Sequence, residues 1–303
     1  MLENGDKEMK KWLGVGMLLL TAIIWGLAFV AQRVGMDYVE PFTFNFSRYV
    51  VGAVVLLPFV IFNQAKKKTT TKKNIKLTII GGLVCGVLLC VATSLQQFGI
   101  ADTEAAGKSG FLTALYIIIV PIIGMFVGKK SKPLIWVCVA LATVGLYLIC
   151  IKEGFSVAIG DIFLVGCALV FSIHIMVIDY VSPKIDGVLL SCMQFAVAGV
   201  ISLVCALLFE KVSVINIFKA WIPVLYCGAL SCGVAYTFQI IGQKYVEPTK
   251  ASLIMCLEAA FATLGGWLIL HEVMTLKELI GCIVVFAAII LAQFTAVKKK
   301  END

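Results

Sequence analysis

The chain has 303 residues, of which 61% are hydrophobic and 14% are charged, and its mean hydropathy is +1.01. A soluble domain needs far more polar surface, so the composition excludes an ordinary soluble globular protein and indicates that lipid surrounds most of the chain. The net charge of +7 does not indicate nucleic-acid binding, because the lysines cluster beside apolar segments.

Ten apolar segments follow one another, each close to the roughly 20 residues that a helix needs to cross a hydrocarbon core of roughly 30 Å. They cover residues 12–31, 43–62, 77–98, 105–127, 134–151, 161–180, 188–209, 221–242, 249–270 and 276–297. The run from Leu13 is long enough to span and shows no signal-peptide cleavage site, so it is predicted to stay as a helix. We therefore predict an all-α integral membrane protein with ten transmembrane helices.

The eleven cysteines lie in apolar segments without C-x-x-C or Cys/His ligand spacing. They are predicted to pack as small hydrophobic residues. We predict no metal site, no catalytic residue and no cofactor.

The basic residues indicate how the chain is oriented. With the N-terminus inside, the cytoplasmic segments hold the lysines of 7–11, 66–76, 129–132, 184, 244–250 and 298–300. The opposite side holds only Arg33, Lys108, Lys152, Lys211, Lys219 and Lys277. By the positive-inside rule, this ratio of about three to one favours a multi-pass protein of the cell membrane with both termini in the cytoplasm.

The second five segments repeat the first five. A shift of about 146 residues places Arg48 on Gln194 and Val51 on Val197, and a shift of about 143 places Gln96 on Gln239, Gly99 on Gly242, Glu104 on Glu247 and Ser109 on Ser252. Because five is odd, the two halves must point in opposite directions across the membrane. Inverted repeats of this kind build many secondary transporters, whose substrate site lies near the bilayer midplane. We predict two inverted five-helix repeats, residues 11–151 and 156–297.

Two stretches resemble a known family. The first comprises Trp25-Gly26, Arg48, Gln97, Gly99, Thr103, Ala105, Ala106, Gly110, Phe111-Leu112-Thr113 and Pro121, and the second comprises Ala251-Ser252-Leu253, Glu258 and His271-Glu272. They resemble the EamA branch of the drug/metabolite transporter superfamily, over nearly the whole chain. The resemblance implies that helices 1 to 4 and 6 to 9 surround a central cavity, with helices 5 and 10 to one side. Ala259 stands where that family usually has Pro, and His271 where it usually has Gly, which leaves the kink of the ninth helix open.

Glu258 is the first candidate for chemistry, because a carboxylate about halfway through a span is costly in lipid and tends to face a cavity or a partner. One interpretation is a proton-coupling or cation-binding site. The other is a structural carboxyl group that is hydrogen-bonded across helices.

Three further polar residues lie within the spans. Arg48 either reaches the membrane interface or turns inward, to a carboxylate of the ninth helix or to an anionic group of the substrate. Its counterpart Gln194 is neutral, so the two half-sites would differ in charge. His174 can relay a proton or simply satisfy a hydrogen bond on an apolar helix.

Rings and amides supply the rest of a predicted substrate cavity. Trp25, Phe29 and Gln32 are spaced at i, i+4 and i+7 and therefore share one helix face. Gln97, Tyr116 and Gln239 add polar groups from the third, fourth and eighth spans. The alternative for the rings is ordinary helix packing, or for Trp25 a position at the membrane interface. Interhelical hydrogen bonds would satisfy the amides without a substrate.

The leading hypothesis is a secondary active transporter that moves a small amphipathic metabolite, such as an amino acid or a nucleobase, by alternating access. No G-x-x-x-x-G-K-[ST] loop is present, so an ion or solute gradient is expected to drive it, with the proton as the first choice. The alternative is an integral-membrane enzyme acting on lipid-linked or small apolar substrates, and a passive channel is a third hypothesis. The predicted partners are the lipid bilayer, a small-molecule substrate and protons, with no nucleic acid. Substrate identity, direction, and the choice between monomer and homodimer stay open.

Overall fold

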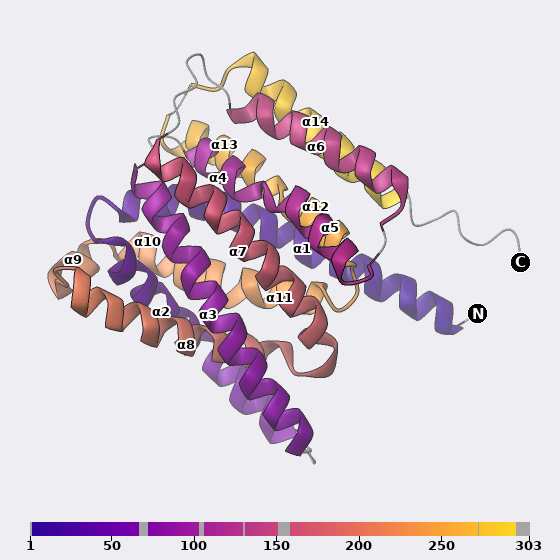
Figure 1. Ribbon diagram of the computed structural model, residues 1–303. Coiled ribbons are helices and arrows are strands. Elements are labelled where there is room, and N and C mark those ends of the chain that lie inside the picture. The colour runs from indigo at the N-terminus through magenta and orange to yellow at the C-terminus, as the bar shows by residue number, and fades with distance from the viewer. Residues whose placement is uncertain are drawn as a thin grey trace, which may run out of the picture.

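The computed structural model describes residues 2–66, 72–102, 106–129, 131–150, 158–271 and 273–294, and the regular elements in these ranges are all helices (Figure 1). Several positions named above lie outside the described residues, namely Lys67, Lys68, Thr103, Glu104, Ala105, Lys130, Lys152, Glu272 and Lys298 to Lys300. The limits at 151, 156 and 297 of the predicted repeats also lie outside them.

The first half of the described chain contains the helices α1 (Leu2–Gly35), α2 (Pro41–Lys66), α3 (Lys72–Asp102), α4 (Ala106–Ala114), α5 (Tyr116–Phe126) and α6 (Pro133–Cys150). Pro41 and Pro133 are the first residues of α2 and α6. Proline is well suited to this position, because the first N–H groups of a helix have no partner within it.

The second half begins with α7 (Ile159–Val181), the 3₁₀ turn η1 (Ser182–Lys184) and α8 (Gly187–Phe209). It continues with α9 (Val214–Lys219), α10 (Trp221–Leu225), the π-helix η2 (Tyr226–Tyr236), α11 (Thr237–Gly242), α12 (Pro248–Met255), α13 (Leu257–Ile269) and α14 (Leu276–Phe294). The three elements α10, η2 and α11 follow one another directly and form one span.

Eight helical stretches in the described ranges are long and apolar enough to cross a membrane: Glu8–Gly35, Pro41–Asn63, Ile75–Asp102, Ala106–Phe126, Ile159–Lys184, Gly187–Phe209, Trp221–Gly242 and Pro248–Ile269. They correspond to eight of the ten predicted segments. The other two, 134–151 and 276–297, correspond to the shorter apolar helix α6 and to α14. The protein is an all-helical, multi-pass membrane protein.

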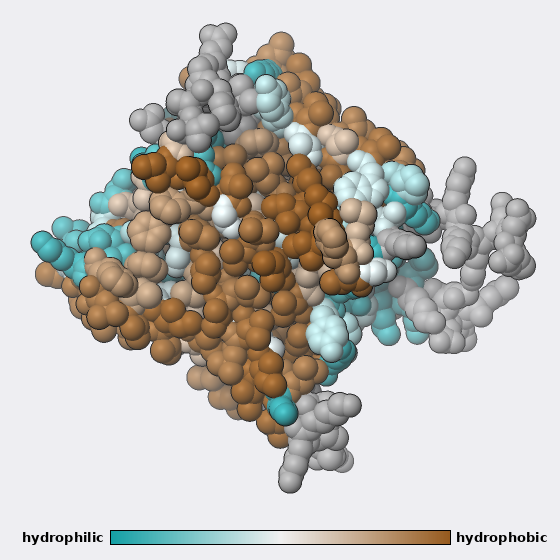
Figure 2. Space-filling view, viewed as in Figure 1, coloured by the Kyte–Doolittle hydropathy of each residue, from teal (hydrophilic) through white to brown (hydrophobic). Residues whose placement is uncertain are grey.

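The surface of the bundle is apolar while polar side chains lie inside it. Figure 2 shows hydrophobic residues covering most of the visible face. Val54 and Leu207 are 63% and 66% exposed, whereas Arg48 and Gln194 are 2% and 0% exposed. Apolar side chains suit contact with lipid, whereas polar side chains are kept inside the bundle.

The helix contacts of one half have counterparts in the other. α6 packs along α14 at one edge of the bundle (Figure 1), and α2 packs on α8. The contact of α3 with α7 corresponds to that of η2 and α11 with α1. In the same way, the contact of α7 with α4 and α5 corresponds to that of α1 with α12 and α13. Exchanging the two halves therefore maps the α6–α14 and α2–α8 contacts onto themselves and maps each of the other contacts onto its counterpart.

Two close backbone approaches show the same correspondence. A Cβ atom built on Gly99 would lie 2.9 Å from the carbonyl oxygen of Gly160, and one on Gly242 would lie 3.1 Å from that of Gly14. These two pairs are related by the sequence shifts of about 143 and 146 residues. Only glycine allows two helices to come this close.

A second set of contacts agrees with the first. A Cβ atom on Gly86 would lie 2.9 Å from the carbonyl oxygen of Gln194, and one on Gly228 would lie 2.9 Å from that of Arg48. Arg48 and Gln194 are the counterparts predicted from the sequence. Their backbones occupy equivalent places although their side chains differ in charge.

Two spans are interrupted about halfway along. α4 gives way to α5 at Leu115, and α12 gives way to α13 at Cys256. Ala259 N donates to the Cys256 carbonyl oxygen at 3.2 Å, a tighter turn than the α-helix makes. The ninth predicted helix is thus broken even though Ala259 replaces the proline that is usual in the family.

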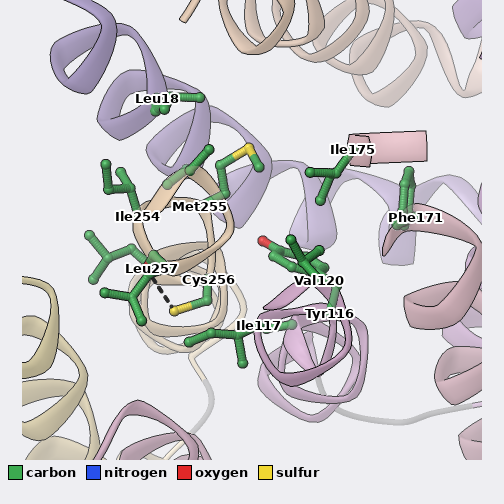
Figure 3. Close-up of a cluster of buried hydrophobic side chains, with 14 of the residues drawn as sticks. Leu18, Tyr116, Ile117, Val120, Phe171, Ile175, Ile254, Met255, Cys256 and Leu257 are labelled. Atoms are coloured by element: carbon green, nitrogen blue, oxygen red, sulfur yellow. Dashed lines mark hydrogen bonds between the residues drawn. The ribbon is translucent and has the colours of Figure 1, made fainter. Parts of the chain in front are cut away.

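The two interruptions lie side by side in the core. Figure 3 shows Tyr116 and Ile117 of α5 opposite Cys256 and Leu257. The Cys256 thiol donates to the carbonyl oxygen of Leu253 at 3.0 Å, so it takes a carbonyl group of the preceding turn as its partner. Packing of one broken helix on the other places the residues of both breaks at the centre of the molecule.

His271, just after α13, has a φ of 56°. This left-handed conformation favours glycine, because a Cβ atom crowds the neighbouring backbone. The glycine that is usual in the family at this position would adopt it without strain.

Candidate functional site

A small internal cavity of about 20 Å³ lies between helices of both halves, with room for about one water molecule. Its wall is formed by Trp25, Ala28, Phe29 and Gln32 of α1, Arg48 of α2, Gln96 of α3, Thr113 of α4, Tyr116 of α5, Phe171 and Ile175 of α7, Ser231 and Tyr236 of η2, Gln239 of α11 and Glu258 of α13. A guanidinium, a carboxyl group, amides and rings therefore meet at one place.

Seven of the ten predicted site residues lie on this wall: Trp25, Phe29, Gln32, Arg48, Tyr116, Gln239 and Glu258. The other three, Gln97, His174 and Gln194, are buried but do not line the cavity. The Gln97 side chain donates from Nε2 to the backbone oxygen of Gln32 at 3.4 Å. It therefore packs behind the α1 face that the cavity uses.

Arg48 turns inward rather than reaching the membrane interface. Its Nη1 donates to Oε1 of Gln32 at 2.8 Å. The ring centroids of Phe44 and Tyr49 lie 5.8 Å and 5.4 Å from its Cζ atom. The Tyr49 hydroxyl group in turn forms a hydrogen bond of 2.5 Å with Thr93 Oγ1 of α3. The guanidinium is thus held at the cavity by α1, α2 and α3 together.

Glu258 lies in the first turn of α13, directly after the interruption at Cys256, and is 3% exposed. Tyr116, the first residue of α5, lines the cavity with it. Glu258 Oε1 and the Tyr116 hydroxyl group have no hydrogen-bond partner among the described residues. The two broken helices therefore present a carboxyl group and a phenol hydroxyl group to the same small space.

His174 and Gln194 form a pair one layer behind the wall. His174 Nε2 donates to Gln194 Oε1 at 3.1 Å and joins α7 to α8. The His174 ring lies 6.3 Å from that of Phe171 and 6.4 Å from that of Tyr236, both of which line the cavity. Two rings of the cavity wall therefore neighbour His174, which does not itself line the cavity.

One further site residue, Gln96, could have been predicted from the internal repeat. Gln96 is the repeat counterpart of the predicted Gln239, and both line the cavity. Ser231 and Tyr236 had no such signal, because the wider turn of the π-helix η2 changes which residues share a face. Tyr236 packs on Trp25 with ring centroids 4.7 Å apart.

A second cavity, of about 310 Å³, lies where α1 ends and α2 begins. Its wall includes Asp37, Glu40, Thr43, Lys211 and Asn216. Beside this cavity, Glu210, which follows the end of α8, is hydrogen-bonded to the start of α2. The Glu210 carboxylate accepts hydrogen bonds from Phe42 N at 2.7 Å, Thr43 N at 2.8 Å and Thr43 Oγ1 at 2.7 Å.

Known proteins resemble this chain along most of its length. An uncharacterized transporter of Archaeoglobus fulgidus is 28% identical over 290 residues, which cover 95% of this chain and 88% of that protein. The uncharacterized transporter YoaV of Bacillus subtilis is 27% identical over 293 residues, covering 94% of this chain and 98% of its own. A solved crystal structure matches with a TM-score of 0.73 at 14% sequence identity, over 95% of this chain and 99% of the other, which shows the shared fold.

The model of the EamA-like transporter family matches residues 12–151 and again residues 158–294. The two matches together cover nearly the whole chain. The protein is a multi-pass membrane transporter that belongs to the EamA-like transporter family.

Proposed function

We propose that this transporter is a secondary active carrier that moves a small amphipathic metabolite, such as an amino acid or a nucleobase, across the cell membrane by alternating access. One observation carries the proposal: both halves of the chain line a buried cavity whose wall combines Arg48, Glu258, amides and rings. Inverted-repeat transporters hold their substrates at such an interface between halves.

The proposal includes ten transmembrane helices in two inverted five-helix repeats, residues 11–151 and 156–297. The matched contacts of Gly99 and Gly242, and of Gly86 and Gly228, support it, because two unrelated halves would not pack through equivalent residues. α6 and α14 are then the fifth helices of the two repeats. The excess of lysine on one side supports cytoplasmic positions for both termini.

The small size of the cavity supports a cycle of opening and closing. Pockets for small molecules usually measure about 300–1,000 Å³, far more than the about 20 Å³ found here. A metabolite therefore requires the lining helices to separate. The interruptions at Leu115 and Cys256 and the π-helix η2 carry wall residues, and such irregular turns are common places for a helix to bend.

Glu258 is the proposed coupling group. It supplies the carboxyl group of the described wall, and a carboxyl group can hold or release a proton. A carboxyl group inside a span marks an ion or proton path in many carriers. Gain and loss of one proton, in step with opening to either side, would link substrate flux to the proton gradient.

The proposal is tested with purified protein reconstituted into vesicles. A thermal-shift screen over metabolite classes at two pH values first identifies a stabilising ligand, because a ligand of the folded state raises its stability by mass action. We expect the radiolabelled ligand to accumulate unchanged when a pH gradient is imposed. Chemical conversion of the ligand would instead support an enzyme, and single-channel currents would support a channel. Tags at the N-terminus and at position 152 should be accessible from opposite faces.

A further inference from the structure

The Arg48 guanidinium is buried with one edge unused. Nη1 is bonded to Gln32, whereas Nε and Nη2 have no hydrogen-bond partner within the described chain. The N–H bonds of Nε and Nη2 lie on the same edge of the planar group and point in nearly the same direction. This edge matches the two oxygens of a carboxylate or a phosphate group, which it binds through two parallel hydrogen bonds.

The surroundings of Arg48 leave its charge uncompensated. The ion pairs between described residues do not include it. The rings of Phe44 and Tyr49 attract a cation, but this attraction is smaller than the cost of removing a full charge from water. A buried charge is normally completed by an opposite charge and by hydrogen bonds.

Glu258 lines the same cavity but is not paired with Arg48. Its Oε1 atom also lacks a partner among the described residues. A guanidinium and a carboxyl group thus line the same cavity, and each has a polar atom without a hydrogen-bond partner among the described residues. A ligand in that space can satisfy both, whereas the resting protein satisfies neither.

We infer that the free edge of Arg48 binds an oxyanion of the transported substrate, either a carboxylate or a phosphate group. The inference rests on the proposed transport function, because it takes the cavity as the substrate site. The second half offers no equivalent charge, since the counterpart Gln194 is bonded to His174 behind the wall. The substrate therefore binds in one orientation, with its oxyanion toward α2.

The test compares small molecules that carry different head groups on the same hydrocarbon group. The probes are 3-phenylpropionate, phenylalanine, 3-phenylpropylphosphonate, 3-phenylpropylamine and 3-phenylpropanol, together with the same five head groups on an isobutyl body. The melting temperature of the purified full-length protein is measured with each. We expect a carboxylate or the phosphonate to raise it and the amine and alcohol to leave it unchanged. The carboxylate and phosphonate arms distinguish the two oxyanions, and phenylalanine shows whether an added amine strengthens binding.

Two variants assign the effect to the guanidinium edge. Arg48→Gln introduces the residue found at the counterpart position, and we expect it to weaken oxyanion binding by about tenfold or more, as loss of a charged hydrogen bond does. Arg48→Lys keeps the positive charge but lacks the two parallel N–H donors. Its affinity for the oxyanion should therefore lie between those of the wild type and Arg48→Gln. Arg33→Gln is the matched control, because Arg33 is partly exposed, pairs with Asp37 at 3.4 Å and lies outside the cavity.

The melting temperatures of the wild type with the different probes test the inference even if a variant does not fold. The inference is overturned if no oxyanion on either body stabilises the wild type, if the amine or alcohol stabilises it better, or if Arg48→Gln binds the oxyanion as well as the wild type does. Flux of a cationic or neutral ligand in vesicles would overturn this inference alone. Absence of any flux for a bound oxyanion would instead count against the transport proposal.

Discussion

Gly145 on α6 and Gly281 on α14 face each other across the contact between these two helices. A Cβ atom on Gly145 would lie 2.8 Å from the carbonyl oxygen of Gly281, and one on Gly281 would lie 2.6 Å from that of Gly145. The relationship is reciprocal, so each backbone fills the space that a side chain of the other would need. This contact joins the last helices of the two proposed repeats, and neither helix contributes to the cavity wall.

We expect Gly281→Val to lower the melting temperature of the purified protein, because the new side chain would push α14 away from α6. Overpacking of a close contact typically costs about 1–3 kcal/mol. Gly16→Ala is the matched control, since a Cβ atom on Gly16 meets nothing within 4 Å. Equal melting temperatures for Gly281→Val and the wild type would show that the two helices do not pack this closely.

We expect Glu258→Gln to abolish proton-driven flux while expression and fold stay intact. Glutamine has nearly the same shape but cannot carry a proton, so the variant should bind ligand and ignore an imposed pH gradient. Uptake into vesicles with and without that gradient measures this. The control is Glu247→Gln, which alters an exposed carboxyl group directly before α12, just outside the span that holds Glu258. Gradient-driven uptake by Glu258→Gln at the wild-type rate would exclude Glu258 as the coupling group.

We expect Glu210→Gln to loosen the start of α2. The carboxylate accepts three hydrogen bonds from Phe42 and Thr43, and an amide offers only one acceptor atom for them. Hydrogen bonds to a charged group contribute about 1.5–3 kcal/mol each. Hydrogen exchange should therefore accelerate at residues 42–45. Glu40→Gln is the control, because Glu40 accepts only one contact of 3.4 Å from Lys211 N. Exchange at the wild-type rate in Glu210→Gln would mean that this cap does not hold α2.

We expect His271→Gly to raise the melting temperature. The left-handed conformation costs a residue with a Cβ atom about 1–2 kcal/mol relative to its preferred one, and glycine escapes most of this strain. The opposite exchange provides the comparison: Gly128 has a φ of 80°, so Gly128→Ala should lower the melting temperature. A lower value for His271→Gly would indicate that the imidazole makes a contact that outweighs the strain.

The site residues show which parts of the prediction succeed. Trp25, Phe29 and Gln32 follow helical spacing, so their shared face could be predicted, and all three line the cavity. His174 and Gln194 follow the same rule of being polar within a span. They lie behind the wall because their mutual hydrogen bond satisfies them there. Spacing along one helix gives a common face, but the neighbouring helices decide where that face points.

The sequence by itself determined that the chain is a helical membrane protein of the EamA-like family, because apolar length, lysine asymmetry and the internal shift are properties of residue order. The tertiary structure alone decided that Arg48 turns inward, that Glu258 and Tyr116 meet at two helix interruptions, and that Ser231 and Tyr236 reach the cavity. These outcomes depend on helix rotation and on local departures from α-helical geometry. Contacts between residues far apart in the sequence fix both.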